Sequence, residues 1–479
     1  MMMKILAIET SCDETSVAIL EIKNGQLKIL SNIVSSQIKI HAPFGGVVPS
    51  LAKREHQKNL VPVLKQGLLA AKLLKQKTKG NVQKSNKAQN LKLKTISRLL
   101  DREPELLKKL LPFLKKYQKP AIDYIAVTNG PGLEPALWVG VNFTKALGYF
   151  WNLPIIPINH IEAHIFANWL PDSKKSSLTL TKEEKLLPLG KSQEGFFSDK
   201  QFIIKDKLLP AIALIVSGGH TQLILIKKTD QAGQTTREFP FLYTILGETR
   251  DDAAGEAFDK LAKMLNLGYP GGPIVAKIAK KLTDNELKQN KTEAAPQSAS
   301  SRRVSILNQR QSASFDYQAA LTLPRPMISS ANYDFSFSGL KTAARYLIKT
   351  LSPKQIKKLT PAICAEFQQA VVDVLVKKTI RAAKEFDAKT VLLSGGVAAN
   401  DLLRESLEGA IYSLNEAKNQ TEESKILFSV PAKNYCTDNA AMVGLTAYVK
   451  LLPIKDQKSR QQLNDDWQRI QAIGNLRLV

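Results

Sequence analysis

Three apolar runs in this sequence each reach a glycine-rich turn, and stretches with helical spacing separate them. The runs cover residues 121–132, 210–226 and 388–400. Apolar residues recur at helical spacing between them, for example in 360–386. Residues 4–20 add two apolar strands joined by a polar turn. This alternation of strand, glycine turn and helix predicts an α/β architecture.

The length and composition are typical of a soluble globular protein. The 479 residues suffice for two or three domains, and 44% are hydrophobic while 23% are charged. No window offers the ~18 uninterrupted apolar residues that a membrane span requires, and the N-terminus lacks the pattern of a secretory signal. Cys12, Cys364 and Cys436 are too few and too dispersed for a disulfide framework. We therefore expect a cytoplasmic protein without a membrane partner.

The formal net charge of +25 is the strongest signal in the composition. A cytosolic protein this basic usually binds a polyanion, most often nucleic acid, although a basic composition can also serve solubility alone. Residues 71–120 hold fifteen Lys and Arg against three acidic residues, a local net charge of +12. This stretch is either an RNA-facing arm or a solvated surface.

Four stretches look like insertions into the α/β framework: 71–120, 171–209, 282–330 and 401–425. Two are rich in Ser, Lys and Gln, and the last carries mixed charge. They are predicted to be surface loops or partly disordered arms. The leucine-rich piece 99–117 is an exception, because it can also form a helix.

Glycine-rich turns after strands suit phosphate binding, since glycine lets backbone N–H groups approach an anion closely. Two such turns lie at 217–220 and 394–397, and a hydroxyl-rich turn lies at 10–16. Together they suggest a nucleotide held between two lobes, whereas each alone is also an ordinary tight turn. The acidic stretch 247–260, followed by 269–273, can accept hydrogen bonds from substrate hydroxyls or simply stabilise a helix start.

His160 and His164 are spaced i, i+4, so both imidazoles can reach one metal ion from one helical face. Asp438 is a candidate third ligand, although an Asp at a helix start is also an ordinary N-cap. Zinc proteases of this type need Glu immediately after the first His, whereas Glu162 comes one position later. Two ordinary packing histidines remain the alternative.

Taken together, these residues resemble the TsaD family, the tRNA N6-adenosine threonylcarbamoyltransferases of the actin/hexokinase/Hsp70 (ASKHA) superfamily. The resemblance spans nearly the whole chain outside the insertions and the tail after about 450. Nine motifs carry it in family order: IETSCDETSVAIL (8–20), HAPFGGVVPSLAKREH (41–56), TNGPGL (128–133), INHIEAHIFA (158–167), VSGGHTQL (216–223), GETRDDAAGEAFDKLAKMLNLGYPGGP (247–273), DFSFSGLKTA (334–343), SGGVAAN (394–400) and CTDNAAM (436–442).

The resemblance implies a two-lobed ASKHA fold with the active site in a cleft. The N-terminal lobe would be 1–165, completed by 430–479, and the C-terminal lobe 166–429. The implied reaction transfers threonylcarbamoyl from threonylcarbamoyl-AMP to N6 of adenosine 37 in tRNAs reading ANN codons, giving t6A and AMP. The implied partners are tRNA, a paralogous non-catalytic ASKHA subunit and a small ATPase.

The resemblance also implies a divalent metal ion, Fe²⁺ in preference to Zn²⁺, on His160, His164 and Asp438. Asp13 and Glu14 would line the cleft as catalytic residues. Eight residues would bind the substrate: Ser217, Gly218, Gly219, His220, Thr221, Asp259, Gly272 and Asn400.

Three other functions remain open. A metalloprotease-like hydrolase would use the paired histidines, but Glu162 is misplaced for it. A small-molecule kinase would share the fold, but the charge of +25 would then have no role. A non-catalytic ASKHA scaffold would have no need of His160, His164 and Asp438.

Overall fold

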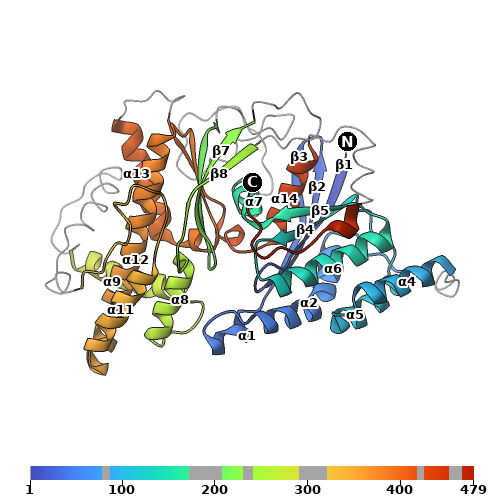
Figure 1. The fold of residues 1–479 in the computed structure, drawn as a ribbon, viewed down its shortest axis with the longest axis horizontal. Helices are drawn as coiled ribbons and strands as arrows, with labels where there is room; N and C mark the ends of the chain where they lie inside the picture. Colours follow the sequence, from blue (N-terminus) through green and yellow to red (C-terminus); the bar gives the residue numbers. More distant parts are fainter. Residues whose placement is uncertain are drawn as a thin grey trace. The chain divides into compact units, whose positions relative to one another are not determined.

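A computed structural model describes residues 2–77, 87–171, 208–229, 241–290, 321–417, 425–452 and 466–478. The chain divides into two compact units. Unit 1 comprises Met1–Leu209, Ile226–Thr244 and Ser429–Val479, and unit 2 comprises Pro210–Leu225 and Ile245–Phe428. Figure 1 labels the helices and strands of both.

The first sheet lies in unit 1 and has the order β3-β2-β1-β4-β5. β1 pairs antiparallel with β2, which pairs antiparallel with β3, whereas β1, β4 and β5 run parallel. The two strands predicted within 4–20 are therefore confirmed as a hairpin. The bounds are β1 (Met2–Glu9), β2 (Glu14–Lys23), β3 (Gln26–Ser36), β4 (Tyr124–Gly130) and β5 (Ile155–Asn159).

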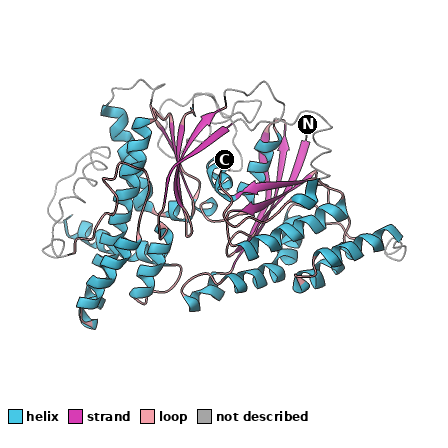
Figure 2. Ribbon diagram, in the orientation of Figure 1, coloured by secondary structure: helices cyan, strands magenta, loops and turns pink. Residues whose placement is uncertain are grey.

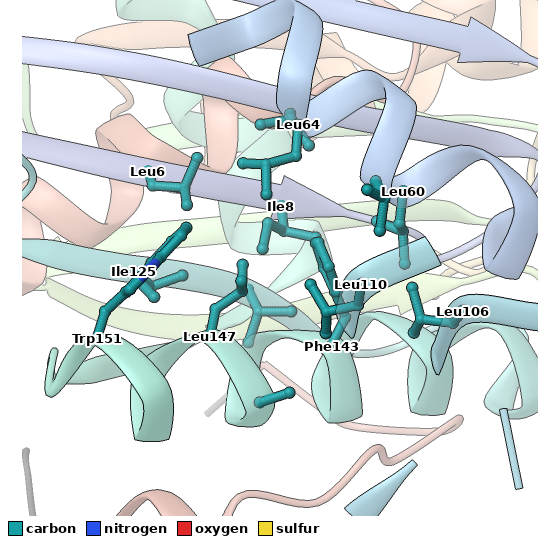
Figure 3. Close-up of a cluster of buried hydrophobic side chains, with 14 of the residues drawn as sticks. Leu6, Ile8, Leu60, Leu64, Leu106, Leu110, Ile125, Phe143, Leu147 and Trp151 are labelled. Carbon is teal, nitrogen blue, oxygen red and sulfur yellow. The ribbon is translucent and has the colours of Figure 1, made fainter. Parts of the chain in front are cut away.

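Helices cover this sheet because alternate residues of its central strand are apolar on both faces. Figure 2 shows helices alongside the strands of this sheet. Leu6 and Ile8 pack with side chains from helices α2, α5 and α6 in the core drawn in Figure 3, and α2 contacts both α5 and α6. On the other face, a Cβ at Gly444 would lie 3.2 Å from the Cβ of Ala7, so helix α14 packs closely there. The helices of unit 1 are α1 (Ile38–His41), α2 (Pro49–Ala70), α4 (Lys87–Leu99), α5 (Pro104–Lys116), α6 (Glu134–Trp151), α7 (His160–Phe166) and α14 (Ala440–Leu451).

The second sheet has the order β10-β9-β6-β7-β8, with β6 and β9 parallel. Its strands are β6 (Ala211–Val216), β7 (Thr221–Lys228), β8 (Phe241–Glu248), β9 (Thr390–Ser394) and β10 (Leu427–Ser429). The helices of unit 2 are α8 (Ala254–Met264), α9 (Gly271–Asn290), α11 (Ser338–Thr350), α12 (Pro353–Glu385) and α13 (Asp401–Ala417). The predicted α/β class is confirmed.

The loop prediction was wrong for 87–99, 104–116, 282–290 and 401–417, which are helical, whereas 71–77 and 321–330 are turns and loop as predicted. Residues 401–417 form α13, with Leu403, Leu407 and Ile411 buried at helical spacing. In 71–120, α4 and α5 are both helices, which confirms the helical alternative for the leucine-rich piece. Most of 171–209 and of 282–330 lies outside the described residues.

Among the described helices, only α12 is long and apolar enough to cross a bilayer by length and composition. Half of its most apolar window is buried inside the protein. Core helices of soluble proteins have the same properties, so this is weak evidence for a membrane span.

Candidate metal centre and glycine-rich turns

The paired histidines open α7, directly after β5 (Figure 1). The side chain of Asn159 caps the helix by accepting hydrogen bonds from the backbone N–H groups of Ile161 and Glu162, at 2.9 and 3.2 Å. This cap starts the helix at His160, so His160 and His164 fall on one face. Their rings meet edge to face with centroids 4.6 Å apart, and both are buried.

Asp438 lies beside these two rings, in the turn that precedes α14. Its Oδ1 is 3.1 Å from Nε2 of His164 and 3.5 Å from Nε2 of His160. The N-cap of α14 is not Asp438 but Asn439, which accepts from the N–H of Met442. One ligand atom from each of the three predicted ligands lies within 4.8 Å of the others, so this trio can hold a metal ion.

Glu9, the last residue of β1, and Ser11, two residues later, contact the Nδ1 side of the His160 ring. Oε2 of Glu9 lies 3.2 Å from Nδ1 of His160, and the Ser11 hydroxyl donates to Oδ2 of Asp438 at 3.4 Å. Burial opposes the charged form of His160, but Asp438 and Glu9 outweigh it and raise its pKa to about 9. Burial lowers the pKa of His164. A metal ion bound at Nε2 would replace the proton that His160 otherwise holds.

The turn carrying Asp13 and Glu14 follows directly. Burial, together with the negative charges of Asp13 and Asp438, raises the pKa of Glu14 well above its ordinary value. Behind the turn, His56 of α2 bonds to the carbonyl oxygen of Cys12, and burial lowers the pKa of His56 to about 4. The two predicted catalytic carboxylates thus lie next to each other at the start of β2, in the same unit as the metal ligands.

The glycine-proline-glycine stretch after β4 packs against this turn. The N–H of Leu133 donates to the carbonyl oxygen of Ser11 at 2.7 Å. A Cβ at Gly132 would lie 2.6 Å from that same oxygen, closer than real Cβ atoms come, so only glycine fits. This contact holds Ser11 against the metal ligands.

Glu162, the only acidic residue between the histidines, is engaged elsewhere. Its Oε2 lies 2.8 Å from Nζ of Lys450, and the Tyr243 hydroxyl donates to its Oε1 at 3.2 Å. Because Glu162 is buried in these contacts, it is not available as the general base of a metalloprotease.

The eight predicted substrate-binding residues all belong to unit 2, and several of them lie close together. A Cβ at Gly255 would lie 2.9 Å from Cα of Gly218, which places the 217–220 turn against the start of α8. The Thr221 hydroxyl accepts from the N–H of Ala254 there. Behind the turn, a Cβ at Gly395 would meet the carbonyl oxygen of Val216 at 2.4 Å, so the two glycine-rich turns adjoin.

The remaining members of that set have structural partners. Asp259 accepts from the N–H of Gly271 at 2.7 Å, which places Gly272 in the adjacent turn of α9. Asn400 bonds to the side chain of Gln368 and accepts from the N–H of Leu403 at the start of α13. Within the described part of the chain, an added Cβ at Gly218, Gly219 or Gly396 would meet no atom within 4 Å, so a ligand has room there.

Sequence reasoning did not single out Glu9, Ser11 or His56. Glu9 is a charged residue that follows the apolar run 5–8 at the end of its strand, and it is fully buried. A buried charged residue needs a hydrogen-bonding or charged partner, and this requirement was the signal that could have marked Glu9 as part of the site. His56 closes the second motif but gave no indication of its contact with Cys12.

Comparisons with known proteins identify the family of the chain. The family model described as tRNA N6-adenosine threonylcarbamoyltransferase, TsaD, matches residues 28–80, 103–181, 193–322 and 305–445. A protein of that name from Thermosipho africanus is 36% identical over 448 residues, covering 93% of this chain and 94% of the relative. This chain belongs to the TsaD family. The transferase class predicted from the motifs is thereby confirmed.

Further relatives show the same coverage. The tRNA N6-adenosine threonylcarbamoyltransferase of Bacillus subtilis is 35% identical, covering 92% of this chain and 88% of the relative. Among solved structures, the ROK hexokinase from Thermus thermophilus matches at 11% identity with a TM-score of 0.34, covering 94% of this chain and 99% of that one. The family assignment rests on the sequence relatives and not on this structural likeness.

Proposed function

We propose that this chain transfers threonylcarbamoyl from threonylcarbamoyl-AMP to N6 of adenosine 37 in tRNAs reading ANN codons, forming t6A and releasing AMP. The observation that carries the proposal is the grouping of His160, His164 and Asp438 in a member of the TsaD family. The net charge of +25 suits a tRNA substrate. The proposal also includes a cytoplasmic location, with a paralogous ASKHA subunit and a small ATPase as partners.

The three ligands would hold one divalent ion, Fe²⁺ in preference to Zn²⁺. Two imidazoles and one carboxylate are the donor set typical of non-haem Fe²⁺ sites with open positions. When bound, the ion would supply Lewis acidity toward an oxygen of the carbamoyl or phosphate group. The protein's own share is to orient two reactants, since an acyl phosphate already has a good leaving group.

The acidic turn would serve the attacking amine. The exocyclic N6 is a poor nucleophile, so a carboxylate is needed to accept its proton as the new C–N bond forms. We assign this role to the pair Asp13 and Glu14. Burial and the negative charges of Asp13 and Asp438 raise the pKa of Glu14, so this carboxyl group holds a proton more readily than an ordinary glutamate does.

The glycine-rich turns of unit 2 would bind the AMP portion. Gly218, Gly219 and Gly396 have open space where a side chain would stand, so their backbone N–H groups can approach a phosphate. The Ser217 and Thr221 hydroxyls, His220, Asp259, Gly272 and Asn400 would complete this subsite.

The test is a reaction of the protein with tRNA, threonylcarbamoyl-AMP and the partner subunits, followed by mass spectrometry of tRNA nucleosides. One modified adenosine per AMP released, at position 37 alone, is the expected result. Failure to form product with any partner combination, using folded and metal-loaded protein, would favour the scaffold or kinase functions.

A further inference from the structure

Glu9 is a buried carboxylate that faces three hydrogen-bond donors at once. Its Oε1 accepts from the N–H of Ser11 at 2.5 Å, and its Oε2 accepts from the Thr128 hydroxyl at 2.5 Å. The same Oε2 lies 3.2 Å from Nδ1 of His160, and no part of Glu9 is exposed to solvent. An ionised carboxylate only accepts hydrogen bonds, so it can satisfy all three of these neighbouring groups.

We propose that Glu9 is a positioning residue for the metal centre. By accepting the Nδ1–H of His160, it leaves the lone pair of Nε2 directed at the ion held with His164 and Asp438. A carboxylate behind a ligating imidazole fixes both its tautomer and its ring orientation. The inference rests on the metal site of the proposed function.

The two histidines differ in what holds their imidazole rings in place. Nδ1 of His164 is buried and has no hydrogen-bond partner among the described residues. Packing against His160 therefore holds its ring, whereas a carboxylate orients the ring of His160. Loss of Glu9 should disorient one ligand and leave the fold of α7 unchanged.

Substitution by glutamine gives a specific expectation. A Gln at this position offers one acceptor oxygen, which the N–H of Ser11 takes, and one NH₂ group directed at Thr128 and His160. The Thr128 hydroxyl can rotate to accept, but His160 must then accept at Nδ1 and carry its proton at Nε2. That proton occupies the position where the ion would bind.

The experiment measures Zn²⁺ affinity of the full chain by competition with a chromophoric chelator, without tRNA or partners. Glu9→Gln is expected to weaken Zn²⁺ binding by about 10- to 100-fold. The matched control is Glu162→Gln, another buried glutamate between the two ligands in sequence, and it is expected to bind like the wild type. Circular dichroism checks that both variants fold.

An equal loss in the two variants, or wild-type affinity in Glu9→Gln, would overturn the inference. If Glu9→Gln does not fold, Glu9→Asp takes its place, because it withdraws the same carboxylate by one methylene. Unchanged Zn²⁺ affinity in Glu9→Asp would also overturn the proposed role of Glu9. Wild-type protein that binds no Zn²⁺ would refute the metal site itself. If Glu9→Gln still modifies tRNA and binds Zn²⁺ with unchanged affinity, only the role of Glu9 is refuted and the proposed function stands.

Discussion

Nε2 of His56 donates to the carbonyl oxygen of Cys12 at 2.9 Å, while Nδ1 accepts from the Thr15 hydroxyl at 2.8 Å. This pair of bonds ties α2 to the turn that carries Asp13 and Glu14. The same ring is buried, which explains its low pKa.

The burial of His56 predicts acid sensitivity. The pKa of His56 is about 4 in the folded protein against 6.5 ordinarily, so the unfolded chain binds more protons between these values. The stabilisation is complete above pH 6.5 and is lost as the pH falls toward 4, with about 2 kcal/mol lost by pH 5. Urea unfolding of wild type and His56→Gln, each at pH 6.5 and at pH 5, measures this loss of stability. A free-energy difference between the two proteins that does not change with pH would contradict the assignment.

The ion pair of Glu162 with Lys450 should stabilise the fold without serving chemistry. Glu162→Gln is expected to lower the free energy of unfolding by about 1–3 kcal/mol, because a buried hydrogen-bonded charge is lost. Thermal unfolding measures this, and metal content should stay at the wild-type level. Loss of the bound metal in this variant would show that Glu162 supports the ligands after all.

The outer face of α5 should contribute to tRNA binding. Lys108, Lys115 and Lys116 are exposed, while Leu110 on the opposite face is buried. Changing the three lysines to Gln should weaken binding and reduce the salt slope by up to about 3, because each lysine that pairs with a phosphate adds about one to that slope. Filter binding across salt concentrations measures it.

The matched control removes the same charge elsewhere. Lys349, Lys354 and Lys357 are exposed lysines of unit 2, and their change to Gln should alter the slope less. Equal changes of the salt slope in the two triple variants would mean that the overall positive charge attracts tRNA and that α5 offers no defined binding surface. Deletion of 71–120 is a poor test, because it would also remove core residues.

The packing of α5 against the core gives a separate prediction. Leu110 packs in the cluster of Figure 3 with residues of α2 and α6. Leu110→Ala is expected to cost about 2–5 kcal/mol of stability, as large-to-small changes in a core do. Urea unfolding measures it, with Leu69→Ala on the exposed side of α2 as control. A cost below about 1 kcal/mol would mean that α5 is peripheral.

The sequence predicted those parts of the fold whose signal is local. The β1–β2 hairpin and the pairing of His160 with His164 each depend on residues within a few positions of one another. The loop prediction failed for α13 because its charged residues obscured the spacing of Leu403, Leu407 and Ile411. Helix formation there depends on burial of one face, which composition does not report.

Long-range contacts explain what the sequence did not reveal. Glu9 meets His160 across 151 positions, and His56 meets Cys12 across 44. Neither pair shares a local pattern: the first sheet brings Glu9 to His160, and the packing of α2 on β2 brings His56 to Cys12. Asp438 was found through the order of the motifs, because an Asp before a helix is ordinarily a cap.

Removal of the Asp438 carboxylate tests whether His160, His164 and Asp438 form the metal centre of a tRNA transferase. The most direct measurement compares wild type, Asp438→Asn and Glu162→Gln for metal content and for t6A formed on tRNA with threonylcarbamoyl-AMP and partners. Wild type and Glu162→Gln should form product, while Asp438→Asn should lose its metal and form about 100-fold less. Full product from metal-free Asp438→Asn would contradict the account.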